Sequence, residues 1–173
     1  MLQIDPDFYG TSCARLVRRE TICPLGPGAP NEALRAVLET LDPSAIAKPH
    51  AVNDLDMAQC CMSALWLRHD FLDQSHRISQ HVATPTGSYW HGIMHRREGD
   101  FSNSKYWFRK VGDHPIFSQL SEHSEAGDWD PFAFVDACQS AVNSGGSDET
   151  CCRQLQQLEW EILFDYCYTA AIK

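Results

Sequence analysis

Apolar residues recur at helical rather than strand spacing along most of the chain. They repeat every three or four positions in four long segments, at about residues 34–41, 54–80, 132–142 and 148–171, which is the period of an amphipathic helix. No run of alternating β-branched residues, internal repeat or low-complexity tract interrupts this pattern. The sequence therefore predicts a mainly α fold, a single-domain bundle-like array of five or six helices.

Capping and turn residues set the expected ends of these helices. Residues 23–30 hold three prolines and two glycines, so residues 1–30 are expected to be irregular. The longest helix is expected to run from Asn53 or Asp54 to about Gln80, because no Gly or Pro interrupts it. The other expected N-caps are Asn31, Ser88, Asn103 and Asp130, and the expected stops are Asp42-Pro43, Gly99 and Gly112.

Length and composition place the chain among globular domains. Its 173 residues suit one domain over 1–173. The N-terminal residues lack a signal-peptide pattern, and no stretch approaches the roughly 18–20 apolar residues of a membrane span. The eight cysteines include two adjacent pairs inside helical patterns and no Cys-x-x-Cys, which favours buried free thiols over disulfides or a zinc ribbon. A cytoplasmic protein that does not enter a membrane is expected.

The net charge of −9 is distributed unevenly along the chain. Residues 91–110 hold five basic and two acidic residues, whereas residues 121–165 hold ten acidic residues and one basic residue. One interpretation is that the two regions pack together and neutralise each other. The other is that the basic segment receives an anionic ligand. Aromatic residues between the basic ones could stack on bases, but the overall negative charge opposes binding to a nucleic-acid partner.

Two segments place histidines and carboxylates on one helix face. The first carries His69, Asp73 and His76, and the second carries His91, His95 and Glu98, both at i, i+4 and i+7 spacing. In each set the side chains can reach a common point. Polar residues thus replace apolar ones at positions that continue a core face.

Asp73-x-x-His76 and His95-x-x-Glu98 are pairs of the kind that bind transition metals inside helical bundles. The sequence therefore predicts a candidate divalent metal site formed by His76, His91, His95, Asp73 and Glu98. Further carboxylates could come from Asp136 or from the last helix, at Glu159, Glu161 or Asp165. Without a metal, the same residues could form a buried hydrogen-bond network.

Catalysis is also possible without a metal, because a histidine beside a carboxylate is oriented as a general base. The candidate catalytic residues are His76, His95, Asp73 and Glu98, and the candidate ligand-binding residues are His69, His91, Arg96, Arg97, Lys105 and Arg109. The arginines could hold a carboxylate or phosphate through paired hydrogen bonds. No nucleophile motif is present: Gly-x-Ser-x-Gly, the P-loop and His-Glu-x-x-His are all absent.

One stretch, GSYWHGIMHRREGDFSNSKYWFRKVGDHP over residues 87–115, resembles the signature of a family of uncharacterised microbial proteins. LRHDFLDQSH at residues 67–76 and WDPFAFVD at residues 129–136 are similar to its flanking motifs. The resemblance covers about residues 55–170. It implies no activity, cofactor or site residue.

Two functions from different classes remain open at this point. The first is a small-molecule enzyme or binding protein in which the His/Asp/Glu/Arg cluster binds or transforms a small anionic ligand. The enzyme classes that fit this cluster are a hydrolase and a metal-dependent enzyme. The second is a non-catalytic interaction module in which the same cluster is structural and the acidic C-terminal third meets a partner. The sequence leaves the oligomeric state open.

Overall fold

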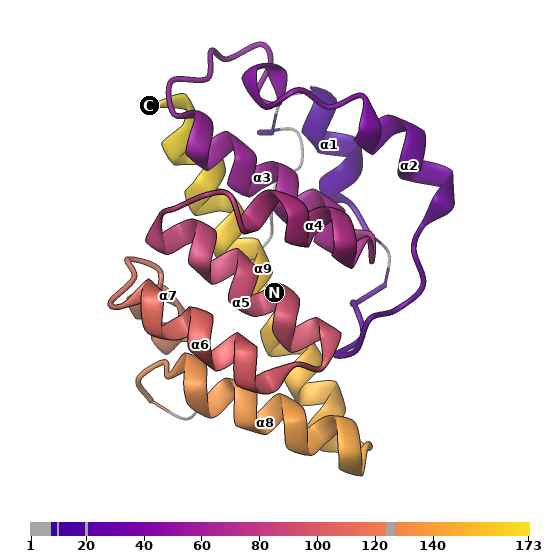
Figure 1. The fold of residues 1–173 in the computed structure, drawn as a ribbon, viewed down its shortest axis with the longest axis vertical. Coiled ribbons are helices and arrows are strands. Elements are labelled where there is room, and N and C mark those ends of the chain that lie inside the picture. Colours follow the sequence, from indigo (N-terminus) through magenta and orange to yellow (C-terminus); the bar gives the residue numbers. More distant parts are fainter. Residues whose placement is uncertain (1–7, 10, 20, 124–126) are drawn as a thin grey trace.

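The computed structural model describes residues 8–9, 11–19, 21–123 and 127–173, and every regular element within them is a helix (Figure 1). The fold is mainly α, as the sequence predicts. The described residues form nine α-helices and one short 3₁₀ helix, more than the five or six expected. In chain order they are α1 (Thr11–Val17), α2 (Glu32–Glu39), η1 (Pro43–Ala45), α3 (Leu55–Arg68), α4 (Leu72–Ser79), α5 (Pro85–Glu98), α6 (Phe101–Val111), α7 (Phe117–Glu122), α8 (Pro131–Ser144) and α9 (Ser147–Ile172).

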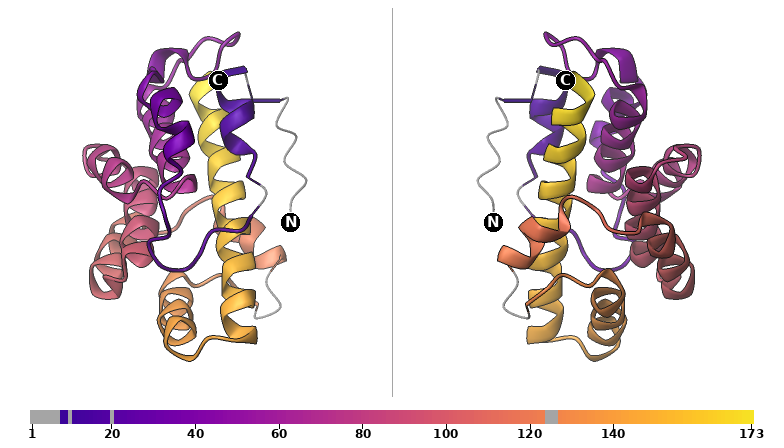
Figure 2. Two further views of the ribbon diagram at one scale, coloured as in Figure 1. Left: turned by 90° about the vertical axis from the view of Figure 1, so that its right-hand side faces the viewer. Right: turned by 90° about the vertical axis from the view of Figure 1, so that its left-hand side faces the viewer.

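The long helix α9 organises the packing. It runs along the long axis of the molecule and contacts α3, α7 and α8 (Figures 1 and 2). Helix α5 packs against α3, α4 and α6, and α6 in turn packs against α8. This arrangement places α4, α5 and α6 side by side on the face shown in Figure 1. In the described part of the chain, no helix combines the length and the apolar character that a membrane span needs.

The segment expected to form one helix from about residue 54 to residue 80 forms two. Asp54 is the N-cap of α3, as expected, and its carboxylate accepts a hydrogen bond from the Met57 N–H at 3.0 Å. The helix ends at Arg68, and α4 begins at Leu72. Asp70 lies between them with a φ of 64°, a left-handed conformation that a helix cannot contain. The prediction of one continuous helix was wrong.

The conformation of Asp70 is stabilised by contacts that are distant in the sequence. Its buried carboxylate accepts hydrogen bonds from Arg97 Nη2 at 2.6 Å and from Arg19 Nη2 at 2.8 Å. Hydrogen bonds to charged groups contribute about 1.5–3 kcal/mol each, which exceeds the roughly 1–2 kcal/mol cost of one left-handed residue. Arg97 also donates to the Gly26 carbonyl at 2.9 Å, so the same group holds the proline-rich N-terminal segment.

Other helix ends differ from the sequence prediction by a few residues. Asp130 caps α8 as expected, with Pro131 at the first helical position. The cap of α5 is Thr84 rather than Ser88, and the cap of α6 is Asp100 rather than Asn103. Helix α1 lies within the first thirty residues, which were expected to be irregular, and α7 was not predicted.

The two oppositely charged regions of the sequence pack against each other. Arg96 on α5 forms a fully buried ion pair with Glu159 on α9. Lys105 on α6 pairs with Asp136 on α8 at the surface. The neutralisation expected from the charge distribution is therefore confirmed for these two pairs. All eight cysteines are free thiols, and six of them are buried.

His114, after α6, is a buried neutral histidine away from the other imidazoles discussed below. Its Nδ1 accepts a hydrogen bond from the Ile116 N–H at 3.4 Å, so the proton lies on Nε2, which donates to Thr86 Oγ1 at 3.1 Å. The rings of Tyr89, Phe117 and Tyr166 surround it. Burial lowers the pKa of His114 to about 4, although the Asp113 carboxylate opposes the shift.

We expect the protein, kept free of metal ions, to lose stability as the pH falls from about 6.5 to 4. An unfolded histidine has a pKa near 6.5, so within this interval the unfolded state binds a proton that folded His114 does not. Urea unfolding at pH 7.5, 5.5 and 4.5 in the presence of a chelator measures this loss. The variant His114→Gln should lose about 2–3 kcal/mol less than wild type over this range. Parallel pH profiles would contradict the role of His114, since the other buried histidines contribute equally to both proteins.

Candidate metal centre

Three histidines from two neighbouring helices meet between α4 and α5. His76 lies on α4, and His91 and His95 lie one turn apart on α5. One ring nitrogen of each lies within 4.8 Å of the corresponding nitrogens of the other two, the only such group of His, Cys, Asp or Glu in the described part of the chain. The centroid of the His76 ring lies 4.7 Å from that of the His91 ring and 5.2 Å from that of the His95 ring. We call these three residues the histidine triad.

The two buried histidines of the triad point their Nε2 atoms at each other, 3.0 Å apart. Their Nδ1 atoms lie within hydrogen-bond distance of other side chains. His91 Nδ1 lies 2.8 Å from Ser79 Oγ, and His95 Nδ1 lies 3.0 Å from Glu98 Oε2. A carboxylate can only accept, so His95 Nδ1 carries the proton and its Nε2 presents a lone pair toward His91.

The Ser79 hydroxyl determines which nitrogen of His91 carries the proton. Its Oγ lies 2.9 Å from the Ser75 carbonyl oxygen and can donate its single hydrogen there. His91 Nδ1 then donates to Ser79, and both Nε2 lone pairs face the same point. If the hydroxyl donates to His91 Nδ1 instead, the His91 Nε2–H donates to His95. In the first arrangement the two lone pairs can share a cation, and in the second a proton links the two nitrogens.

His76 completes the triad from the more exposed side. Its side chain is half-buried, and within the described residues its ring nitrogens make no hydrogen bond. Burial keeps the other two imidazoles neutral: it lowers the pKa of His91 to about 3, and it lowers the pKa of His95 although Glu98 opposes this shift. His91 and His95 can therefore offer lone pairs at neutral pH.

The geometry of the triad fits a transition metal. Zn²⁺ binds histidine nitrogen at about 2.0 Å in tetrahedral sites, which puts two ligand nitrogens roughly 3.3 Å apart. The His91–His95 separation of 3.0 Å is close to this value, and a ring nitrogen of His76 lies within 4.8 Å of the ligand nitrogens of both. Metal-bound histidines ordinarily donate their other N–H to a carboxylate or another acceptor, as His95 does to Glu98. Three protein ligands leave one tetrahedral position open.

One face of α6 borders the triad. Asn103, Trp107 and Lys110 lie at i, i+4 and i+7 on this helix. Asn103 Nδ2 donates a hydrogen bond to His95 Nε2 at 3.0 Å, so a metal at this nitrogen would displace the amide. The Trp107 ring lies 4.1 Å from the His91 ring. Sequence reasoning missed these roles, together with that of Ser79. The i, i+4, i+7 spacing on a helix next to the histidines was the available signal.

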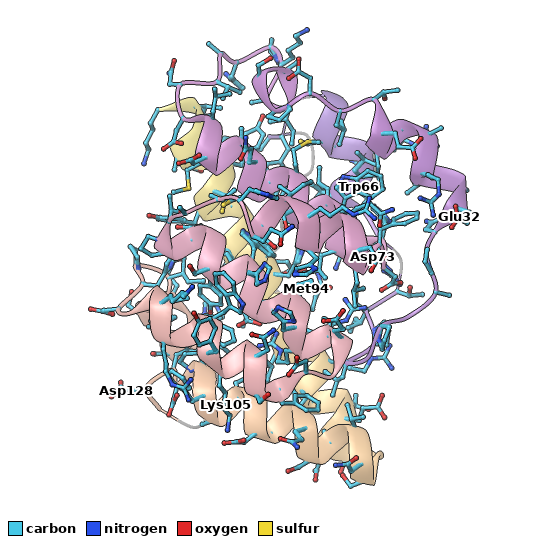
Figure 3. The ribbon with its side chains drawn as sticks, viewed as in Figure 1. Glu32, Trp66, Asp73, Met94, Lys105 and Asp128 are labelled. Atoms are coloured by element: carbon cyan, nitrogen blue, oxygen red, sulfur yellow. The ribbon has the colours of Figure 1, made fainter. Side chains whose placement is uncertain are left out.

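Three residues expected at the site take other positions. His69 points away, with Nε2 2.8 Å from the Leu16 carbonyl oxygen, because the break at Asp70 separates it from the face of His76. Asp73 is exposed and lies outside the group of nitrogens that could share a metal. Glu98 also lies outside that group and orients His95 instead. Figure 3 shows Asp73 on α4, well apart from Lys105.

The expected anion-binding residues are mostly engaged elsewhere. Arg96 pairs with Glu159, and Arg97 pairs with Asp70, so both guanidinium groups are bound inside the protein. Lys105 and Arg109 line a surface groove of about 480 Å³ at the turn between α5 and α6, which contains no histidine of the triad. Of the carboxylates considered on α9, Asp165 accepts a hydrogen bond from Tyr9 at 2.9 Å.

Comparison of the chain with protein-family models, with curated proteins and with solved structures finds no match.

Proposed function

We propose that the protein binds one divalent transition metal ion, with Zn²⁺ the best fit, through His76, His91 and His95. One observation carries the proposal: His91 Nε2 and His95 Nε2 face each other at 3.0 Å while both Nδ1 atoms are already held by Ser79 and Glu98. A cation at the point where the lone pairs meet removes their repulsion and uses the orientation that the surrounding residues impose.

The proposed activity is metal-assisted hydrolysis or hydration of a small molecule. A three-histidine site with an open fourth position is the arrangement of catalytic rather than structural zinc. A metal in such a site lowers the pKa of its bound water to about 7 and so supplies hydroxide at neutral pH. The residues of this chain would hold and orient the ion: Glu98 orients His95, Ser79 orients His91, and His76 is the least buried of the three ligands.

A metal-free network is the alternative, favoured by the ability of Ser79 to donate to His91 and close the chain of hydrogen bonds with a proton. In that case the triad is structural, as in a non-catalytic interaction module. The two functions differ in one measurable property, which is the affinity of the apo protein for a transition metal.

Titration of chelator-treated protein with Co²⁺ tests the proposal, because tetrahedral Co²⁺ absorbs strongly in the visible range. We expect one Co²⁺ per chain in wild type and loss of the absorption in His91→Ala and His95→Ala. The control is His81→Ala, which removes an exposed histidine at the end of α4. Circular dichroism establishes that each variant is folded. A folded wild type without Co²⁺ absorption would overturn the metal site and leave the hydrogen-bonded network.

A further inference from the structure

We infer that Lys110 is the anion-binding residue of this site, and that the ligand at the open metal position carries a carboxylate or phosphate group. This inference rests on the proposed function. Lys110 takes the role that the sequence suggested for Arg96 and Arg97, because both of these arginines form buried ion pairs. Lys110 lies on the same face of α6 as Asn103 and Trp107.

The position of the Lys110 ammonium is defined by two aromatic rings. Its Nζ lies 4.0 Å from the centroid of the Trp107 ring and 4.7 Å from that of Tyr106. The Trp107 ring itself lies 4.1 Å from the His91 ring. The ammonium is therefore no further from the centroid of the His91 ring than the sum of those two distances. In the proposed complex a water molecule can connect the ammonium to an oxyanion bound at the triad.

The charge of Lys110 is not neutralised by any acidic residue in the described part of the chain. Among the described residues, no carboxylate lies within 4.0 Å of its ammonium, whereas the neighbouring Lys105 pairs with Asp136. Cation–π contacts hold the ammonium without using its three N–H donors. The ammonium group thus stays available to an anionic ligand, and its side chain is exposed to solvent from which that ligand arrives.

The charges around the triad also favour an anion. A divalent cation bound by three neutral imidazoles keeps its full positive charge, since His76, His91 and His95 contribute none. Glu98 is the acidic side chain in contact with the triad, and its carboxylate is occupied with His95 Nδ1 on the side away from His91. A ligand with one oxygen on the metal and another at Lys110 would satisfy both positive groups.

Phosphate titration of the Co²⁺-loaded protein tests this inference through the change in the visible spectrum. The variants are Lys110→Gln, the conservative Lys110→Arg and the control Lys105→Gln, whose ammonium already has a carboxylate partner. Acetate serves as a second probe, and imidazole as a neutral ligand for the same metal position. Co²⁺ affinity is measured first for each protein and is expected to be the same in all four.

We expect Lys110→Gln to weaken phosphate binding about tenfold, the change that one lost charge-assisted hydrogen bond produces. Lys110→Arg should restore most of the affinity, Lys105→Gln should resemble wild type, and imidazole should bind all four proteins equally. Unchanged phosphate affinity in Lys110→Gln, with normal Co²⁺ binding, would overturn the role of Lys110 and leave the metal site intact. A wild type that binds no Co²⁺ would overturn both proposals at the first step of the experiment.

Discussion

Replacing Glu159 with alanine is expected to lower the free energy of unfolding by about 3–5 kcal/mol. Glu159 and its partner Arg96 are both completely inaccessible to solvent, and Arg96 also lies over the Phe134 ring at 4.5 Å. Burial by itself would lower the pKa of Arg96, but the Glu159 carboxylate outweighs it and the pKa is raised. The variant therefore leaves a guanidinium that stays charged in the core without a counterion. Urea unfolding at pH 7.5 measures the loss.

Two controls separate this effect from an ordinary loss of packing. The double variant Arg96→Met/Glu159→Leu should recover most of the lost stability, because it removes both charges and keeps apolar volume. The exposed pair between Arg35 and Glu32 gives the comparison at the surface, where solvent screens the charges and Glu32→Ala should cost far less than Glu159→Ala. If Glu159→Ala proved as mild as Glu32→Ala, water would have to reach Arg96 in the folded protein.

Zn²⁺ is expected to raise the free energy of unfolding of the wild type by about 4 kcal/mol when its free concentration is a thousand times its dissociation constant. For a chain of this size, that gain corresponds to a rise in Tm of roughly 8–16 °C. The gain depends on binding to the folded triad, which the unfolded chain does not assemble. His95→Ala should abolish it, because this change removes one of the two closely opposed Nε2 atoms. Thermal unfolding with Zn²⁺ and with excess chelator measures the difference.

Asp73→Ala is the matched control for that experiment. Asp73 belongs to the set of metal ligands that sequence spacing suggests, but it is exposed and lies outside the triad. This variant should keep the full stabilisation by Zn²⁺. Equal stabilisation of wild type and His95→Ala would mean that the ion binds elsewhere on the folded protein.

The helical character of the fold and several of its helix ends could be predicted because they depend on local sequence. The caps at Asp54 and Asp130 and the stop at Gly99 are examples, since each is determined by residues within one turn. The break at Asp70 could not be predicted in the same way. It depends on two arginines far away in the chain, and the apolar period of 3.6 continues on both sides of it.

The same distinction explains which site residues were found. His91 and His95 share one uninterrupted helix, so their i, i+4 spacing correctly placed them side by side. The extension from His69 to His76 assumed a continuous helix and was wrong for His69. Lys110 was counted only as part of a basic segment, because its proximity to the histidines depends on how α6 packs against α5.

The three residues between α3 and α4 also set the rotation of α4 about its own axis. Because each residue of an α-helix advances the side-chain direction by about 100°, adding or removing one residue in this turn would rotate His76 out of the triad. The apolar spacing within α4 would be unchanged. The length of the connection at residues 69–71 is therefore constrained by the chemistry of the site, whereas substitutions there are limited mainly by the left-handed conformation of Asp70 and its two arginine partners.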